Sequence, residues 1–167
     1  MSDHLTYRDI RPDDWQAMHR IVSHWSVVRQ LGRWPWPAQE AFTQSRCQPP
    51  KGDGFVWAIC RDAQVVGSIG ISDADMGYML DPAVQGQGIA TAAATAAIDR
   101  YLAITMHDVI VGSTWVDNPA SARVLEKLGF VHWQTRYVQS VARGYPELVH
   151  HRRLTRSNWQ RLRTVQQ

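Results

Sequence analysis

The stretch that decides the fold is DPAVQGQGIATAAATAAIDRYL, Asp81 to Leu102. Two glycines, Gly86 and Gly88, stand directly before an alanine-rich segment with the composition of a helix. The residues just upstream, MGYML, have the pattern of a β-strand. A strand, a glycine turn and a helix N-terminus together predict an anion-binding site, because free backbone N–H groups and the helix dipole both favour negative charge there.

Three phosphate-binding motifs compete for this turn. A P-loop requires a lysine followed by Ser or Thr after its last glycine, and no such pair is present. A dinucleotide motif requires glycine where Thr91 stands, and neither Asp108 nor Asp117 supplies the acidic residue it needs at the end of the next strand. The third motif is Gln/Arg-x-x-Gly-x-Gly/Ala, in which successive N–H groups face a diphosphate. Its fixed positions are met by Gln85, Gly88 and Ala90.

Length and composition predict one globular domain spanning residues 1–167, with 44% hydrophobic and 20% charged residues. No apolar stretch approaches the roughly 18 residues of a membrane span, and the first residues lack the apolar core of a signal peptide. The two cysteines, Cys47 and Cys60, fit neither a disulfide framework nor a metal-ligand spacing. We therefore expect a cytoplasmic protein without a metal.

Hydrophobic periodicity and breaker residues give an alternating order of strands and helices. The order predicts an α/β fold in which a mixed central sheet of about seven strands is flanked by helices. We expect strands at 5–10, 55–60, 64–72, 75–80, 108–116, 130–138 and 147–154, and helices at 11–25, 38–46, 88–102 and 118–129.

A second motif, VDNPASARVLEKLGF from Val116 to Phe130, joins a strand end to a short helix and a Leu-Gly-Phe return. Together with the glycine turn, it resembles the GNAT (Gcn5-related N-acetyltransferase) superfamily. The segments LTYRDIRPDDW, MGYML and LTRSNW resemble the RimJ/RimL-like branch of ribosomal-protein alanine N-acetyltransferases. The resemblance covers nearly the whole chain and implies an N-acetyltransferase with the GNAT fold.

The resemblance implies acetyl-CoA as co-substrate, lying in a splay between the fourth and fifth strands. Its diphosphate would lie on the glycine turn and its pantetheine arm against main chain, with direct transfer in a ternary complex. Asn118 precedes Pro119 and either caps the following helix or reaches the pantetheine amide. The residues implied are Met79, Leu80, Gln85, Gly86, Gln87, Gly88, Ile89, Ala90, Thr91, Asn118 and Ser121.

Transfer to an amine requires a group that removes the amine proton, and the departing thiolate can accept one. Asp75 lies where many relatives carry a glutamate, and Asp73 and His107 are alternatives that also fit plain turn or loop residues. Many relatives place a tyrosine on the helix after the fifth strand, where it protonates the departing thiolate, and this chain has Leu125 at that position. Ser121, one turn nearer the helix start, is then the candidate acid.

Acceptor specificity is expected from the segments 29–37 and 139–146. Trp34, Trp36 and Tyr145 in these segments are candidate acceptor contacts, with simple packing as the alternative for the tryptophan pair. Ala92 stands where relatives often carry a glutamate. The missing glutamate is expected to change either the acceptor side or the packing of this helix.

Three functions remain open at this point. A protein or peptide N-terminus is the favoured acceptor, a small xenobiotic or antibiotic amine is the alternative, and the third is a non-catalytic acyl-CoA-binding module. The arginine-rich end, HHRRLTRSNWQRLRTVQQ, leaves a contact with RNA or the ribosome open, although a solvated final strand and tail is favoured. Family members often form homodimers, and no segment here marks an interface.

Overall fold

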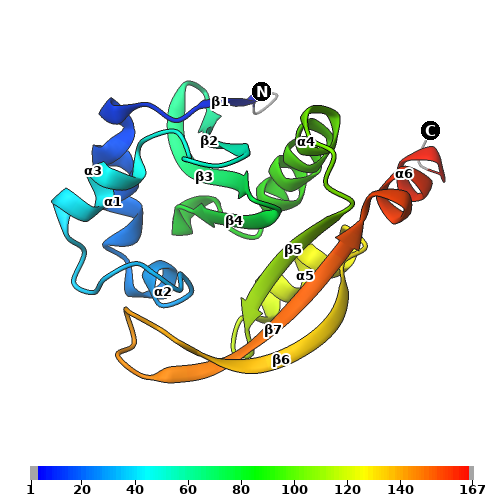
Figure 1. The fold of residues 1–167 in the computed structure, drawn as a ribbon. Coiled ribbons are helices and arrows are strands. Elements are labelled where there is room, and N and C mark those ends of the chain that lie inside the picture. Colours follow the sequence, from blue (N-terminus) through cyan, green and yellow to red (C-terminus); the bar gives the residue numbers. More distant parts are fainter. Residues whose placement is uncertain (1–3, 166–167) are drawn as a thin grey trace.

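The structure is a computed structural model that describes residues 4–165. Seven strands form one sheet in the order β1-β2-β3-β4-β5-β7-β6, and the long β6–β7 hairpin extends it at one end (Figure 1). The strands are β1 Leu5–Asp9, β2 Gly54–Arg61, β3 Gln64–Ser72, β4 Asp75–Leu80, β5 Val109–Trp115, β6 Val131–Gln139 and β7 Pro146–Thr155.

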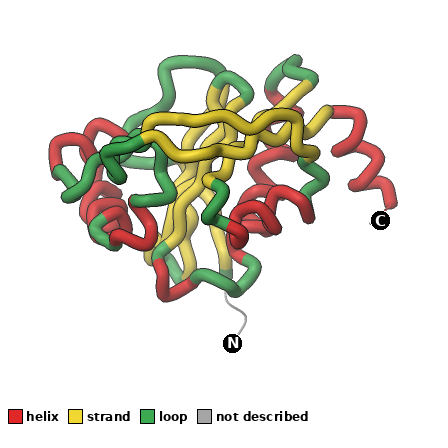
Figure 2. The backbone as a smooth tube through the Cα atoms, turned by 90° about the horizontal axis from the view of Figure 1, so that it is seen from below, coloured by secondary structure: helices red, strands yellow, loops and turns green. Residues whose placement is uncertain are grey.

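Helices cover both faces of the sheet (Figure 2). α1 packs on β3 from one side with α2 and α3 beside it, while α4 and α5 lie on the other (Figure 1). The α-helices are α1 Trp15–Val22, α2 Trp25–Val28, α3 Glu40–Arg46, α4 Ile89–Ile104, α5 Pro119–Lys127 and α6 Arg156–Val165, and the 3₁₀ helices are η1 Pro12–Asp14 and η2 Pro82–Val84. The mixed α/β fold is confirmed.

The sheet opens between β4 and β5, which are its parallel pair. Only the first two residues of β4 are paired with β5, Asp75 with Val111 and Met76 with Gly112. Beyond them, Gly77–Leu80 stay paired with β3 on one side only. The predicted splay of the fourth and fifth strands is therefore confirmed, and it widens toward the C-terminal ends of both strands.

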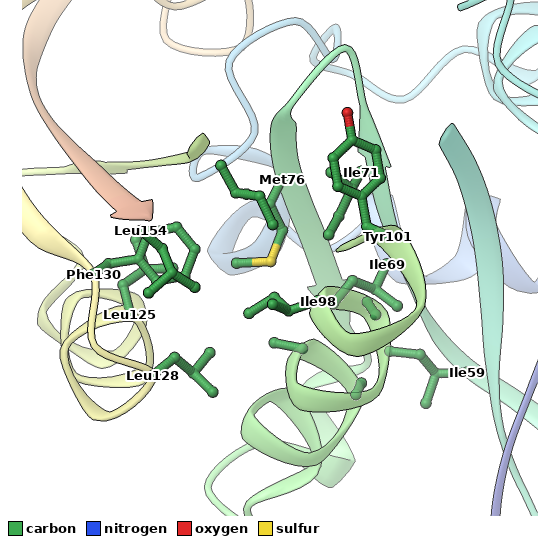
Figure 3. Packing of buried hydrophobic residues seen from close by; sticks show 14 of the residues in the cluster. Ile59, Ile69, Ile71, Met76, Ile98, Tyr101, Leu125, Leu128, Phe130 and Leu154 are labelled. Carbon is green, nitrogen blue, oxygen red and sulfur yellow. The ribbon is translucent and has the colours of Figure 1, made fainter. Parts of the chain in front are cut away.

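The main core lies between the sheet and the pair α4 and α5. Figure 3 shows Leu125, Phe130 and Leu154 gathered on one side of Met76, with Ile98 and Tyr101 of α4 on the other. The Tyr101 hydroxyl accepts a hydrogen bond from the Ala74 backbone N–H at 2.8 Å. This core therefore fixes the β3–β4 turn from which β4 enters the splay.

A buried carboxylate fixes the start of α1 against β1. Asp14 is only 7% exposed and accepts two hydrogen bonds from the Arg8 guanidinium, at 2.8 and 2.7 Å. It also accepts the Arg11 backbone N–H at 2.7 Å. The Arg8 hydrogen bond is the main reason why the pKa of Asp14 is lowered, so the ion pair persists well below neutral pH.

Two segments differ from the sequence prediction. The helix expected over 11–25 ends at Val22, and α2 begins separately at Trp25, where His24 adopts an extended backbone. The solvated tail expected after the last strand is instead the helix α6, whose Trp159 is buried and donates its indole N–H to Asp99 at 2.7 Å. Tertiary contact of one aromatic side chain thus decides the conformation of the last segment.

The arginines of the C-terminal segment have partners within the protein. Arg156 donates to the main-chain carbonyls of Leu102, Thr105 and His107. The others are Arg152 on Glu126, Arg153 stacked on Trp133, Arg161 on Asn158 and Arg163 on Asp99. Each arginine of this segment therefore has at least one contact within the protein.

Candidate active site

The glycine turn leads from β4 into α4 with two left-handed residues. Gly86 has φ of 75° and Gly88 has φ of 79°, a region that side chains other than glycine rarely adopt. A Cβ added at either position would meet no protein atom within 4 Å. Both glycines are therefore required by the backbone shape of an open turn.

The N-terminus of α4 has no side-chain cap, although Gly88 is its N-cap residue. The first helical hydrogen bond runs from the Ala92 N–H to the Gly88 carbonyl at 3.0 Å. The N–H groups before Ala92 therefore have no partner inside the helix. The predicted residues Ile89, Ala90 and Thr91 open this 16-residue helix, so their N–H groups are available to an anion.

Two glutamine side chains hold the turn in place. Gln85 donates to the Leu80 carbonyl at 3.1 Å, and Gln87 donates to the Ala83 carbonyl at 3.2 Å. Arg61, at the end of β2, donates to the Gln87 side-chain oxygen at 2.7 Å. Arg61 thus brings a positive charge to the turn, which the sequence analysis missed because 26 residues separate the two.

The side chains of Met79 and Leu80 are buried, Met79 in the smaller core cluster and Leu80 in the main one. Only their main-chain groups can therefore take part in the splay. Gly77, on the same strand, has open space where a Cβ would stand. An extended ligand arm could pair with this main chain as a strand would.

At the start of α5, Asn118 acts as the helix cap. Its side-chain oxygen accepts the Ser121 N–H at 3.2 Å, and Pro119 occupies the first helical position. The Ser121 hydroxyl accepts a hydrogen bond from the Tyr78 hydroxyl of β4 at 2.9 Å. Ser121 and Tyr78 therefore form a pair of hydroxyls that joins β4 to α5 across the opening.

Tyr78 carries a second hydroxyl group at the site, and the sequence analysis did not identify it as a candidate acid. Leu125, at the position where relatives carry a tyrosine, is 2% exposed and belongs to the core. Burial raises the pKa of Tyr78, and the bond to Ser121 lowers it by less. The phenol is thus protonated at neutral pH and can donate a proton, as its place in MGYML on the splayed strand could have indicated.

Asp75 begins β4 on the same face as its neighbour Val111. Its side chain reaches solvent, yet the surrounding protein removes enough water to raise the pKa of this carboxyl. The positive charge of Arg33 acts in the opposite direction and lowers the pKa by less. A carboxyl with a raised pKa beside the opening suits a base that accepts an amine proton.

The two alternative bases are engaged in loop contacts. Asp73 occupies the β3–β4 turn with φ of 49° and accepts the Asp53 backbone N–H at 3.3 Å. His107 stacks on Tyr101 and lies 3.7 Å from the Asp53 carboxylate. Asp75 is the candidate whose carboxyl has no such structural partner among residues 4–165.

Arg143 joins the two segments expected to form the acceptor side. Its side chain, 3% exposed, donates to both Asp117 oxygens at 2.9 Å, to the Arg29 carbonyl at 3.0 Å and to Gln30. Arg29 also pairs with Asp117 at 2.5 Å. The segments 29–37 and 139–146 therefore meet at the end of β5 and are held there by one guanidinium.

The three predicted acceptor contacts lie in different surroundings. Trp34 packs against the smaller core cluster and contacts Phe42 edge-on. Trp36 is 42% exposed and its ring lies 5.3 Å from that of Trp25, which is equally exposed. Tyr145 is exposed on the β6–β7 loop, where its carbonyl accepts the Ser140 N–H.

Other features limit the chemistry of the described residues. Cys47 and Cys60 are both buried, and burial raises the pKa of the Cys47 thiol to about 11, which is unsuited to a covalent acetyl carrier. Within residues 4–165 no group of three or more His, Cys, Asp or Glu could hold a metal ion. None of the helices described here has the length and apolar character to cross a membrane. Ala92 is exposed on α4.

The splay between β4 and β5 and the uncapped N-terminus of α4 are typical of a class of protein. Such a protein binds a phosphorylated ligand at the helix N-terminus and an extended arm of the same ligand between the two strands. The model of the acetyltransferase (GNAT) domain family matches residues 4–131, and the chain therefore belongs to the GNAT family of acetyltransferases. No curated protein matches the sequence significantly.

Solved structures share the fold at low sequence identity. Aminoglycoside acetyltransferase AAC(6′)-Ib, solved with ribostamycin and coenzyme A, is 16% identical with a TM-score of 0.81, over 96% of this chain and 98% of that one. Spermidine N-acetyltransferase from Vibrio cholerae, solved with coenzyme A and spermine, is 16% identical with a TM-score of 0.78, over 93% and 98%. These likenesses show the fold.

Replacing Arg143 by alanine is expected to loosen the acceptor side. The loss of charge-assisted hydrogen bonds should lower the free energy of unfolding by about 1–3 kcal/mol, toward the lower end because Asp117 is partly exposed and keeps Arg29. Urea unfolding at pH 7 measures this change. The pKa of Asp117 is lowered by Arg143, so the contribution is present above the ordinary pKa of the carboxyl and is lost as pH falls through the lowered one.

Arg153→Ala is the matched control, because Arg153 is exposed and stacks on Trp133 at the surface. Its unfolding free energy should stay within about 0.5 kcal/mol of the wild type. Equal stability of the Arg143 and Arg153 variants would contradict the role given to Arg143.

Proposed function

We propose that this chain transfers the acetyl group of acetyl-CoA directly to a primary amine, with a protein or peptide N-terminus as the acceptor. The observation that carries the proposal is the opening between β4 and β5 beside the uncapped start of α4. Membership of the GNAT family supplies the reaction class. The diphosphate would lie against the N–H groups from Gly86 to Thr91, and the pantetheine arm along Gly77–Leu80.

In the proposed reaction, the ammonium group of the acceptor first loses a proton to the Asp75 carboxylate, directly or through water. The free amine then attacks the thioester carbonyl, a C–N bond forms, the attacking nitrogen loses its second proton to solvent, and the C–S bond breaks. The sulfur leaves as a thiolate, which needs little help because it is a good leaving group. Because Ser121 accepts the hydrogen bond from Tyr78, the hydrogen of the Ser121 hydroxyl is free to pass to the thiolate. Tyr78 can then reprotonate Ser121 and be reprotonated from solvent.

An N-terminus is favoured over a polycation by the charge of the acceptor segments. Residues 29–37 and 139–146 contain three arginines and no acidic residue. The one carboxylate held between them, Asp117, is already paired with Arg29 and Arg143. The RimJ/RimL-like segments of the sequence support the same acceptor, and with it a cytoplasmic location and the homodimer or ribosome contact expected from that branch.

A small aromatic or apolar amine is the second candidate acceptor. The observation in its favour is the exposed pair of Trp25 and Trp36, whose rings can contact an apolar or cationic group. A binding module without turnover would leave the Asp75 carboxyl without a role.

The test is coenzyme A release from acetyl-CoA with peptides, polyamines, aminoglycosides and aromatic amines as acceptors, with the product mass measured. Turnover of peptides is the expected result. Turnover of small amines alone would contradict the peptide acceptor and support a small amine as the acceptor. Binding of acetyl-CoA without turnover of any acceptor would contradict the proposed transferase function.

A further inference from the structure

We propose that the preferred acceptor carries a carboxylate close to its reacting amine, and that Ser113 and Arg33 bind this carboxylate. The inference rests on the proposed function and narrows its acceptor. It is carried by a chain of hydrogen bonds across β6, β7 and β5 that ends at an exposed hydroxyl on the face of Asp75.

The chain begins at Arg136 on β6. Its Nε donates to His151 Nε2 at 3.2 Å, and His151 Nδ1 lies 2.7 Å from the Ser113 hydroxyl. A nitrogen that accepts from arginine carries no proton, so a neutral His151 has its proton on Nδ1. Burial and the charge of Arg136 lower the pKa of His151, which keeps the ring neutral at pH 7.

This proton arrangement decides what Ser113 can do. Because His151 Nδ1 donates, the Ser113 oxygen accepts, and its own hydrogen is left to point outward. His151 therefore cannot act as a base toward Ser113, and the pair is no nucleophilic dyad. His151 is 8% exposed, whereas Ser113 is exposed, so a buried imidazole supports an accessible hydroxyl donor.

Ser113 and Asp75 lie on the same face of the sheet. Val111 is the β5 neighbour of Asp75, and Ser113 follows Val111 by two residues, which returns to the same face. Standard strand spacings place the Cα atoms of Asp75 and Ser113 roughly 8 Å apart, or more where the strands splay. An amine at Asp75 and an acceptor atom at Ser113 thus belong to one short compound.

Arg33 supplies the charge that makes an anionic group the preferred partner. The preceding residue, Gly32, lies beside the end of β5, since a Cβ built on it would be 3.8 Å from the Trp115 ring. The Gly32 carbonyl also accepts the Val141 N–H at 3.2 Å. Arg33 itself is exposed and has no hydrogen bond or ion pair with another described residue. Its charge nevertheless reaches Asp75. This unpaired guanidinium is suited to a carboxylate.

The chemical class is therefore an amine with a nearby carboxylate. Two sources supply it, a peptide whose first residue is Asp or Glu, and a free amino acid with its α-carboxylate. Acceptors that carry several positive charges would meet Arg33 and are disfavoured by like-charge repulsion.

The experiment compares matched acceptors that differ only in this charge. Peptides beginning with Asp or Asn form one pair, and alanine and alaninamide form the other. Coenzyme A release gives kcat/KM for each. We expect the charged member of at least one pair to be preferred by about tenfold to a hundredfold, the value of one charge-assisted hydrogen bond. The pair that shows the preference identifies the source.

Arg33→Gln and Ser113→Ala should each reduce this preference, the ratio of kcat/KM for the charged member to kcat/KM for the neutral member, by about tenfold. Arg100→Gln, an exposed arginine of α4 on the opposite face, is the control and should keep the preference. Equal use of charged and neutral members, or a preference that survives both variants, would overturn the inference while the proposed function stands. A preference for alanine over alaninamide, with no turnover of any peptide, would sustain the inference and overturn the proposed N-terminal acceptor. No turnover of any of the four acceptors would overturn both the inference and the proposed function.

Discussion

Gly88→Val is expected to weaken the binding of coenzyme A by about a hundredfold or more, with the fold retained. Valine disfavours the left-handed backbone that Gly88 adopts, at a cost of about 1–2 kcal/mol. The turn must then either carry this strain or rotate its N–H groups away from the diphosphate. Losing two charge-assisted hydrogen bonds, each worth about 1.5–3 kcal/mol, accounts for the expected loss. Titration calorimetry with coenzyme A measures it.

Gly144→Val supplies the matched control for backbone strain. Gly144 has φ of 76° and, like Gly88, open space where a Cβ would stand, but it lies on the β6–β7 loop. Both variants should lose similar unfolding free energy, whereas only the Gly88 variant should lose coenzyme A. Equal affinities in the two variants would show that the turn before α4 does not hold the diphosphate.

Much of the sheet could be predicted because its boundaries are local. β3 and β4 have the expected bounds, Gln64–Ser72 and Asp75–Leu80. The turn between them is Asp73–Ala74, with positive φ at both residues, the backbone of a two-residue hairpin. Alternating side chains and a polar turn residue are properties of a few neighbouring residues, so one sequence suffices to find them.

The helix α6 could not be predicted in the same way. It has one buried side chain, Trp159, and α4 supplies Asp99, the acceptor of the Trp159 indole N–H. Its first residue, Arg156, donates to carbonyls about 50 positions earlier in the chain. The stability of this helix is thus mainly tertiary, and a short polar segment carries little sign of it.

The candidate site also combines local features, which the sequence predicts, with long-range contacts, which it does not. The glycine turn is a local device and was visible as QGQG before an alanine-rich segment. The Tyr78–Ser121 pair joins residues 43 positions apart, and Arg143 reaches Arg29 over 114. Such contacts depend on which strands become neighbours, so no pattern within either segment could reveal them.

Asp75→Asn is expected to lower kcat for amine acetylation by about 10²–10⁴-fold, the usual contribution of a general base. Asparagine retains the size of the side chain but cannot accept the amine proton, and acetyl-CoA affinity should not change. The wild-type rate should fall as pH drops through the pKa of Asp75, which burial raises above its usual range, because the protonated carboxyl is inactive. The asparagine variant should lack this acidic limb. Initial rates from pH 5 to pH 9 measure both effects.

Asp73→Asn separates the two carboxyls at the entrance to β4. Asparagine tolerates the positive φ of Asp73 and can still accept the Asp53 N–H, so the turn should remain intact. We expect its kcat to stay within about twofold of the wild type, since a residue engaged in a turn gives little to the chemical step. A large loss of kcat in the Asp73 variant with a small loss in the Asp75 variant would identify Asp73, in the β3–β4 turn, as the base instead. Two unaffected variants would mean that the amine reaches the thioester already deprotonated, and that β4 contributes main chain alone.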